Sequence, residues 1–148
     1  MEYLNKLEAT LEVYFGKKAP ALPENIKEII VKIAPYLTII GLILTIPAIL
    51  ILFGLGSAAT MMAPLGGTNS LAAVPTMWFG ILLLIPAVIL EAMAVPGLFA
   101  RKAIAWKYIF WAQLISVVSS LVQLNILGAL ISALIGFYIL FQVKSYYK

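Results

Sequence analysis

Four long stretches of the chain are almost entirely apolar, and each is about as long as a membrane-spanning helix. They cover residues 35–55, 75–94, 103–122 and 124–143. Roughly 20 helical residues are needed to cross the hydrocarbon core of a bilayer. The apolar positions are continuous rather than alternating, and four strands are too few to close a membrane barrel. The pattern therefore predicts an all-α integral membrane protein with four transmembrane helices.

The three connections between these spans differ in length and charge. Residues 56–73 are a long uncharged stretch, residues 96–102 a short basic one, and residues 123–125 a few polar positions. We expect the first to be a loop and the other two to be tight turns. The last two spans should therefore form an antiparallel hairpin.

The beginning of the chain has a different pattern, in which apolar side chains recur at helical spacing among charged ones. The apolar stripe comprises Tyr3, Leu4, Leu7, Leu11, Tyr14 and Phe15. Glutamates and lysines occupy the other faces, so the segment predicts an amphipathic helix. Such a stripe is buried on the inner leaflet, beneath the helical bundle or against another chain.

Helix-breaking residues divide this arm into two parts. We expect the first helix to end at Gly16, and residues 19–23 to form a stiff proline-rich linker. Pro23 and Glu24 are typical of a helix start, because proline suits a first turn and a carboxylate favours the positive end of the helix dipole. Residues 1–33 are thus predicted to be a cytoplasmic amphipathic arm.

Composition supports a membrane location and indicates how the chain is inserted. Of 148 residues, 64% are hydrophobic and 11% charged, and the mean hydropathy is +1.07. Soluble domains carry roughly 25% charged residues. All ten bases lie before the first span, around the second connection or after the last span. The positive-inside rule then predicts that both termini are cytoplasmic.

The distribution of the bases also bears on partners. Several of them flank apolar spans: Arg101, Lys102, Lys107 and Lys144. They do not form one basic face, so a pI of about 9.4 indicates contact with lipid headgroups and no nucleic-acid binding. Residues 1–28 mix both signs of charge, unlike a secretory signal. We expect residues 34–148 to form a transmembrane domain whose first span is an uncleaved anchor.

The residue inventory excludes most enzyme chemistry. The chain has no Cys, His or Asp. Disulfides, thiolate or imidazole metal sites, Ser-His-Asp triads and paired aspartates are therefore unavailable. The serines of the third span are predicted to lie away from the lysines, which disfavours a Ser-Lys dyad. We expect a protein that is not an enzyme, with no cofactor and no metal.

Glu91 is the one acidic residue within a predicted span. A carboxylate in hydrocarbon is costly unless it is neutralised, paired or hydrated. Under one hypothesis the helix ends near residues 96–97, so that Glu91 pairs with Arg101 or Lys102 and anchors the turn. Under the other, Glu91 handles protons or cations together with Gln113, as in a small oligomeric channel or transporter.

Small residues recur every fourth position in the last two spans. They are Ala112, Ser116 and Ser120 in the third span, and Gly128, Ser132 and Gly136 in the fourth. Such stripes let two helix backbones approach closely. Gln113, Ser119 and Asn125 are candidates for hydrogen bonds between the same two helices. We expect the stripes to pack the hairpin rather than to line a pore.

The first two spans share a short sequence pattern. Residues 41–48 and 80–87 both begin with Gly and continue through aliphatic residues to Ile-Pro-Ala. Prolines inside helices free a backbone carbonyl, so Pro47 and Pro86 are predicted kinks. The echo has two explanations, a small inverted repeat as in some transporters or coincidence among few residue types.

The last third of the chain, residues 97–148, resembles a group of small bacterial membrane proteins. The resemblance rests on Gly-Leu-Phe-Ala-Arg-Lys at 97–102, Trp-Lys at 106–107, Ala-Gln-Leu-Ile-Ser at 112–116 and residues 135–142. These segments are similar to uncharacterised integral membrane proteins with four spans. The resemblance implies a bacterial inner membrane and no assigned activity.

Two functional hypotheses follow. The first is a non-enzymatic membrane scaffold or accessory subunit, which packs with membrane lipids and associates with other copies or with another membrane protein. The second is the small oligomeric channel or transporter that uses Glu91.

Overall fold

The computed structural model describes the backbone of residues 2–148 and the side chains of residues 6–68 and 74–148. All regular structure in the described backbone is helical. The α-helices are α1 (Glu2–Leu11), α2 (Glu24–Met62), α3 (Gly67–Phe99), α4 (Ala103–Val122) and α5 (Ile126–Gln142). Shorter helical segments follow three of them: a π-helical segment Glu12–Lys18 and the 3-10 turns Ala63–Gly66 and Lys144–Tyr146.

Four helices are long and apolar enough to cross a membrane. The corresponding segments are Glu24–Gly66, Val74–Phe99, Ala103–Val122 and Ile126–Tyr146. They contain the four predicted spans, so the all-α class with four candidate membrane helices is confirmed. The tight turn at residues 123–125 is confirmed as well, since α4 ends before it and α5 begins after it.

The predicted loop at residues 56–73 is wrong. α2 continues to Met62 and α3 begins at Gly67, so the 3-10 turn Ala63–Gly66 is the whole connection. The hydroxyls of Ser57 and Thr60 donate to carbonyls one turn earlier, at 2.8 Å. Their polarity is thereby satisfied within the helix, and the helix extends beyond the apolar span.

Several predicted helix ends are also wrong, because the helices continue through their breakers. Helical backbone extends through Gly16 to Lys18. α2 begins at Glu24 as expected but runs through Pro35 without a break, so residues 24–33 belong to the first spanning helix rather than to a separate arm helix. α3 likewise passes Pro96 and ends at Phe99. Membrane helices tolerate such prolines because neighbouring groups satisfy the freed backbone.

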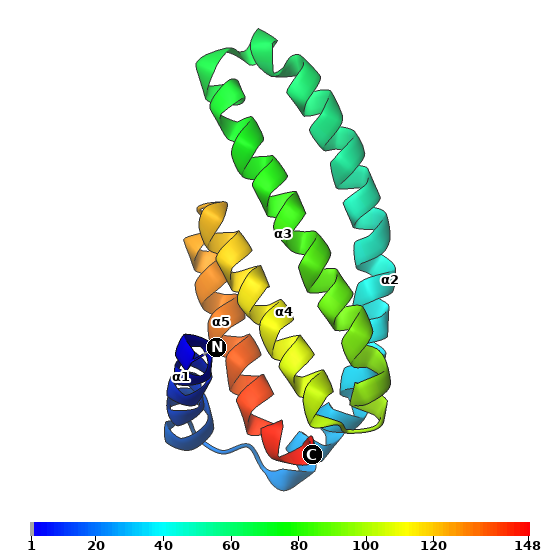
Figure 1. Ribbon diagram of the computed structural model, residues 1–148, viewed down its shortest axis with the longest axis vertical. Coiled ribbons are helices and arrows are strands. Elements are labelled where there is room, and N and C mark those ends of the chain that lie inside the picture. The colour runs from blue at the N-terminus through cyan, green and yellow to red at the C-terminus, as the bar shows by residue number, and fades with distance from the viewer. Residues whose placement is uncertain (1) are drawn as a thin grey trace.

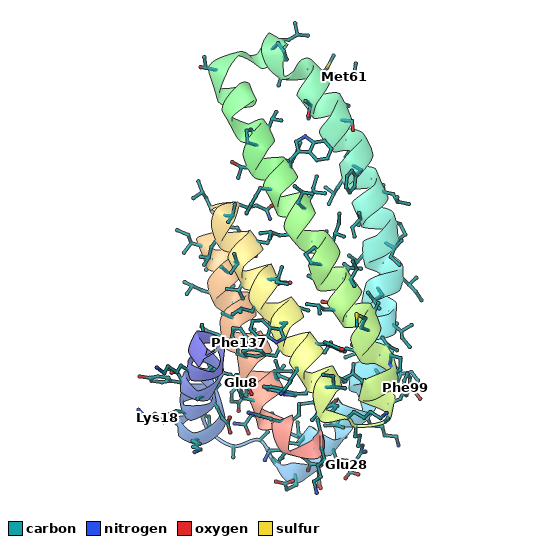
Figure 2. All side chains as sticks on the ribbon, viewed as in Figure 1. Glu8, Lys18, Glu28, Met61, Phe99 and Phe137 are labelled. Atoms are coloured by element: carbon teal, nitrogen blue, oxygen red, sulfur yellow. The ribbon has the colours of Figure 1, made fainter. Side chains whose placement is uncertain are left out.

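The helices are arranged as two antiparallel hairpins of unequal length (Figure 1). α2 packs on α3, α3 on α4 and α4 on α5, so the extensive contacts join helices that are neighbours in the sequence. Gly80 lies against Gln123, because a Cβ on Gly80 would be 3.0 Å from the Gln123 amide. The tips of α2 and α3 therefore project beyond the α4–α5 turn, and Met61 marks that far end (Figure 2).

The core lies at the opposite end, where the basic residues gather. It is built around an aromatic cluster of four buried rings: Trp106, Phe110, Phe137 and Phe141. The Trp106 ring lies 5.5 Å from Phe110 and 5.4 Å from Phe141, measured between centroids. These rings come from α4 and α5, so the shorter hairpin carries most of the buried aromatic area.

The amino-terminal arm packs against α5. Phe15 lies 6.1 Å from Phe137 between ring centroids, and the Lys144 ammonium pairs with Glu8 at 3.0 Å and with Glu12 at 2.6 Å. Figure 2 shows Glu8 and Phe137 at this junction. Of the predicted stripe, Leu11 and Phe15 pack against the helical bundle, whereas Leu7 and Tyr14 are exposed. The side chains of Tyr3 and Leu4 lie outside the described residues.

Candidate functional site

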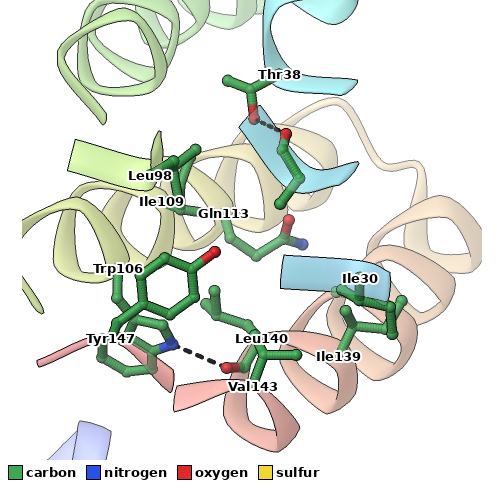
Figure 3. Close-up of a pocket in the computed structure, with 12 residues that line it drawn as sticks. Ile30, Thr38, Leu98, Trp106, Ile109, Gln113, Ile139, Leu140, Val143 and Tyr147 are labelled. Carbon is green, nitrogen blue, oxygen red and sulfur yellow. Dashed lines mark hydrogen bonds between the residues drawn. The ribbon is translucent and has the colours of Figure 1, made fainter. Parts of the chain in front are cut away.

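A cavity of about 180 Å³ lies near the basic end, between α2 and the α4–α5 hairpin. Figure 3 shows the side chains that line it, which include Ile30, Thr38, Leu98, Trp106, Gln113 and Tyr147. A second cavity of about 360 Å³ adjoins the first along α2 and α5. The two share several lining residues: Ile30, Ala34, Thr38 and Ile139. They therefore form one groove, mostly apolar, between α2 and α5.

Gln113 contributes an amide to the wall of this groove. Its Nε2 donates to the Ser132 carbonyl and to the Ser132 Oγ, both at 2.9 Å. A Cβ on Gly136 would lie 2.5 Å from that Nε2, so glycine leaves the space that the amide fills. The predicted hydrogen bond from Gln113 to the neighbouring helix is confirmed, and Gln113 occupies the small-residue surface of α5.

The other small residues have mixed roles. Ala112 is buried, and the Ser120 hydroxyl donates to the Ser116 carbonyl of its own helix at 3.0 Å. The Gly128 N–H donates to Asn125 Oδ1 at 3.0 Å, and a Cβ there would lie 2.4 Å from the Asn125 amide. Gly128 therefore permits a helix cap rather than a close helix–helix contact.

The hydrogen bonds predicted for Ser119 and Asn125 between the two helices are wrong. The Ser119 Oγ accepts from Gln123 at 3.1 Å, one turn further along the same helix. Asn125 caps α5, as described above. Both side chains thus bond locally, because the turn at the end of α4 provides nearer partners than the facing helix does.

Tyr147 closes the groove at its basic end. The side chain is buried, and burial raises the pKa of its phenol above the ordinary value, although the nearby Arg101 guanidinium opposes that shift. The hydroxyl is therefore protonated at physiological pH and available as a donor. It forms no hydrogen bond within the part of the chain that the structure describes.

The turn between α3 and α4 is held by the last residue of the chain. Arg101 has a φ of 51°, a left-handed conformation in which glycine is usual at a helix C-terminus. The Lys102 N–H bonds to Gly97 O at 2.8 Å and the Arg101 N–H to Leu98 O at 3.2 Å, which is the Schellman pattern. Lys148 then bonds through its backbone N–H to Arg101 and through its carbonyl to Ala103. These two bonds hold Arg101 in its strained conformation.

Glu91 is not paired with the basic turn. It lies on the same face of α3 as the buried residues Ala87 and Ala94 and is itself half-buried. Among the described side chains it forms no ion pair or hydrogen bond. Because α3 remains helical to Phe99, Arg101 lies ten residues further on, about 15 Å along the axis. The hypothesis that Glu91 anchors this turn is therefore wrong.

The four predicted headgroup residues also separate into two groups. Arg101, Lys102 and Lys107 are exposed. Lys144 is engaged inside the protein, since it pairs with two glutamates of the arm and its ammonium lies 4.8 Å from the centre of the Trp106 ring. Contact of the three exposed bases with lipid stays a prediction.

The similar sequences at residues 41–48 and 80–87 lie in different environments in the structure. Pro47 and Pro86 lie inside continuous helices, so neither ends a span. A Cβ on Gly41 would meet nothing within 4 Å, whereas one on Gly80 would press on Gln123. The kinks at the two prolines stay a prediction.

Sequence reasoning missed the groove and the aromatic cluster. A signal for the cluster was present, because Trp106 and Phe110 are four residues apart, as are Phe137 and Phe141, and such pairs share a helix face. The groove had no comparable signal, since its walls come from residues more than 100 positions apart.

Together the fold and this groove define an all-α membrane protein made of two unequal helical hairpins. Comparisons with family models, with curated proteins and with solved structures give no match.

Proposed function

We propose that the chain is a non-enzymatic membrane scaffold or accessory subunit that packs with lipid and associates with further copies of itself. The observation that carries this proposal is the exposure of α2. Only 6% of its most apolar window is buried. Its side chains remain largely uncovered at Ile43, Leu44 and Leu50, which are 63%, 68% and 69% exposed. An apolar surface of this extent is a site for lipid or for another protein.

α2 is less buried than the other three spanning helices, which favours a second copy of the chain as one of the partners that cover its exposed surface. In α3, α4 and α5 the corresponding windows are 22–28% buried. α2 packs extensively on α3 alone. Within a bilayer the hydrophobic effect does not drive helices together, because lipid tails are as apolar as the side chains. Association is driven instead by close packing between helices. A second chain against α2 supplies packing that the single chain lacks.

The polar side chains of the spans support a scaffold more than a water-filled path. Thr38, Thr45 and Ser120 donate to carbonyls of their own helices at 2.7–3.0 Å. Gln113 is bonded to Ser132. The hydroxyls are thus engaged within their own helices and Gln113 joins α4 to α5, which leaves few polar groups to hydrate a pore.

The proposed location is a bacterial cytoplasmic membrane with both termini in the cytoplasm. The support for the orientation is the gathering of the bases at one end, while the opposite connection is uncharged. The bacterial assignment rests on the resemblance over residues 97–148. Lipids of that membrane and further copies of the chain are the proposed partners.

Cysteine cross-linking tests self-association, and the chain has no native cysteine to interfere. We expect Leu50→Cys on α2 to form disulfide-linked dimers in native membranes under oxidation. Ile131→Cys, which is also exposed but lies on α5, is the matched control and should cross-link far less. Equal yields at the two positions, or a dimer fraction that disappears on modest dilution with lipid, would contradict the proposal.

One observation favours the channel or transporter as a second candidate. Glu91 is half-buried on the inner face of α3 without an ion pair among the described residues. Unpaired ionisable groups inside a membrane domain are often functional. Proteoliposomes containing the wild-type chain would then dissipate a proton or alkali-cation gradient, and Glu91→Gln would abolish the flux. Glu28→Gln, which removes an exposed acid, should retain it. A wild-type chain without flux would exclude this function.

A further inference from the structure

The groove between α2 and α5 is long enough and apolar enough to hold hydrocarbon. Its inner part, about 180 Å³, exceeds the roughly 150 Å³ of an engineered apolar cavity that binds benzene. Its outer part, about 360 Å³, continues along Ile33 and Leu37 of α2. Ile29, Ile33 and Leu37, which line the outer part, are exposed, so the groove opens on the surface of the protein.

The inner end of the groove holds an unused hydrogen-bond donor. Figure 3 shows the Tyr147 hydroxyl directed towards the middle of the cavity, on the side of Gln113. It has no hydrogen-bond partner within the described residues. The structure has no buried side-chain N or O atom without a partner among the described residues, so this hydroxyl is accessible from the cavity and can donate to an acceptor on a bound molecule.

Two bases that are free of carboxylates lie next to Tyr147. Lys148 follows it directly and is tied to Arg101 by a backbone hydrogen bond of 3.0 Å. Both side chains are exposed and form no ion pair within the described part of the chain. They line a polar cavity of about 550 Å³ together with Glu24, whose carboxylate is already bonded to Lys27 and Tyr146. Two basic side chains therefore lie, with one glutamate, in a polar cavity beside the residue that closes the groove.

We propose that the groove is a binding site for one anionic phospholipid. An acyl chain lies between α2 and α5, a glycerol ester carbonyl accepts a hydrogen bond from the Tyr147 hydroxyl, and the phosphate lies at Arg101 and Lys148. This inference goes beyond the scaffold function, because the lipid binds to a single chain and requires no second copy.

The order of the three chemical features favours this occupant over others. An apolar wall, a hydroxyl donor and a pair of bases follow one another from the groove to the basic end. A phospholipid presents its chain, ester and phosphate in the same order, and anionic headgroups are attracted to basic residues at the membrane surface. A second copy of the chain would bring apolar side chains but no anion for Arg101 and Lys148.

Trp106 reports on occupancy, because it lines the groove and is only 2% exposed. In a variant carrying Trp78→Phe and Trp111→Phe, Trp106 is the sole tryptophan. We expect its fluorescence to be quenched by phosphatidylglycerol with a brominated acyl chain, at a low fraction of this lipid in phosphatidylcholine vesicles. Unlabelled phosphatidylglycerol should reverse the quenching, and brominated phosphatidylcholine should quench much more weakly.

Matched variants separate the headgroup from the groove. Arg101→Gln with Lys148→Gln should raise the fraction of lipid needed for half quenching on the order of tenfold. Lys102→Gln with Lys107→Gln removes the same amount of charge from exposed positions that line neither cavity. This control should change the lipid fraction needed for half quenching only a little. Ala34→Phe should fill the groove and reduce quenching, whereas Leu44→Phe on the exposed side of α2 should not.

Two results would overturn the proposal. Equal quenching by the two brominated lipids, in proportion to their abundance, would mean contact with bulk lipid only. Protection of Trp106 from every brominated lipid, relieved when the protein is diluted to monomers, would mean that a second copy fills the groove.

Discussion

Trp106→Ala should destabilise the protein more than any other single substitution considered, by about 3–5 kcal/mol in the free energy of unfolding. The ring is 2% exposed, is stacked on Phe110 and meets Phe141 edge-on. Its Nε1 donates to the Leu140 carbonyl at 2.8 Å, which joins α4 to α5. Its face also lies under the Lys144 ammonium that binds the arm. One substitution therefore removes packing, a buried hydrogen bond and a cation–π contact.

The measurement is thermal unfolding in detergent, followed by the loss of the monodisperse peak in size-exclusion chromatography. Trp78→Ala is the control, since Trp78 also donates a hydrogen bond, to Thr60, and meets one ring, Phe53. It lies in the projecting tip of α2 and α3, where burial is less complete. A midpoint that falls equally in the two variants would show that the aromatic cluster is not the main source of stability.

Gly97→Ala should cost about 1–3 kcal/mol, although it adds only one methyl group. A Cβ on Gly97 would lie 2.7 Å from the Cβ of Ala105 and 3.6 Å from its Cα. Such a distance forces α3 and α4 apart, because the facing atoms belong to or adjoin the backbone and cannot rotate away. The two helices start to separate beside the turn that holds Arg101.

Two further variants make this prediction specific. Ala105→Gly, combined with Gly97→Ala, moves the methyl group to the opposite helix and should restore most of the lost stability, measured by the same unfolding assay. Gly41→Ala is the control, because a Cβ there meets nothing within 4 Å, and alanine is the better helix former. If Gly41→Ala were as harmful as Gly97→Ala, the close approach of α3 and α4 would not be the cause.

Part of the fold was predictable because it depends on local properties. The third predicted span, residues 103–122, coincides with α4, and the fourth differs from α5 by a residue or two at each end. A span needs a certain number of consecutive apolar residues, and that number is visible in the sequence alone. The tight turn at 123–125 followed for the same reason, as there was no room for a loop.

The wrong predictions concern helix ends and the first connection, where a helix-breaking or polar residue was expected to stop a helix and did not. Gly16 and Pro96 did not end their helices, since helical backbone continues to Lys18 and to Phe99. The uncharged stretch 56–73 was interpreted as a loop because it lies between the first two predicted spans. The segment is nevertheless helical to Met62, and the Ser57 and Thr60 hydroxyls find acceptors on the preceding turn of that helix.

Only part of the candidate site could be predicted from the sequence. Gln113 could be identified because a polar side chain in an apolar run needs a partner, and Ser132 belonged to the predicted stripe. Arg101 was predicted to contact headgroups, but Tyr147 and Lys148 gave no such indication, and nothing joined the three residues. Their proximity depends on a hydrogen bond between residues 101 and 148, which no pattern along the chain describes.

The sequence by itself determined that the protein is all-helical, how many helices can cross a membrane, and that its bases gather at one end of those helices. These properties depend on hydropathy and charge, which add up residue by residue along the chain. Only the tertiary structure decided that Glu91 lacks an ion-pair partner among the described residues, that the arm docks on α5, and that an apolar groove between α2 and α5 is closed by Tyr147. Those features depend on which distant side chains meet, and packing geometry, not composition, determines that.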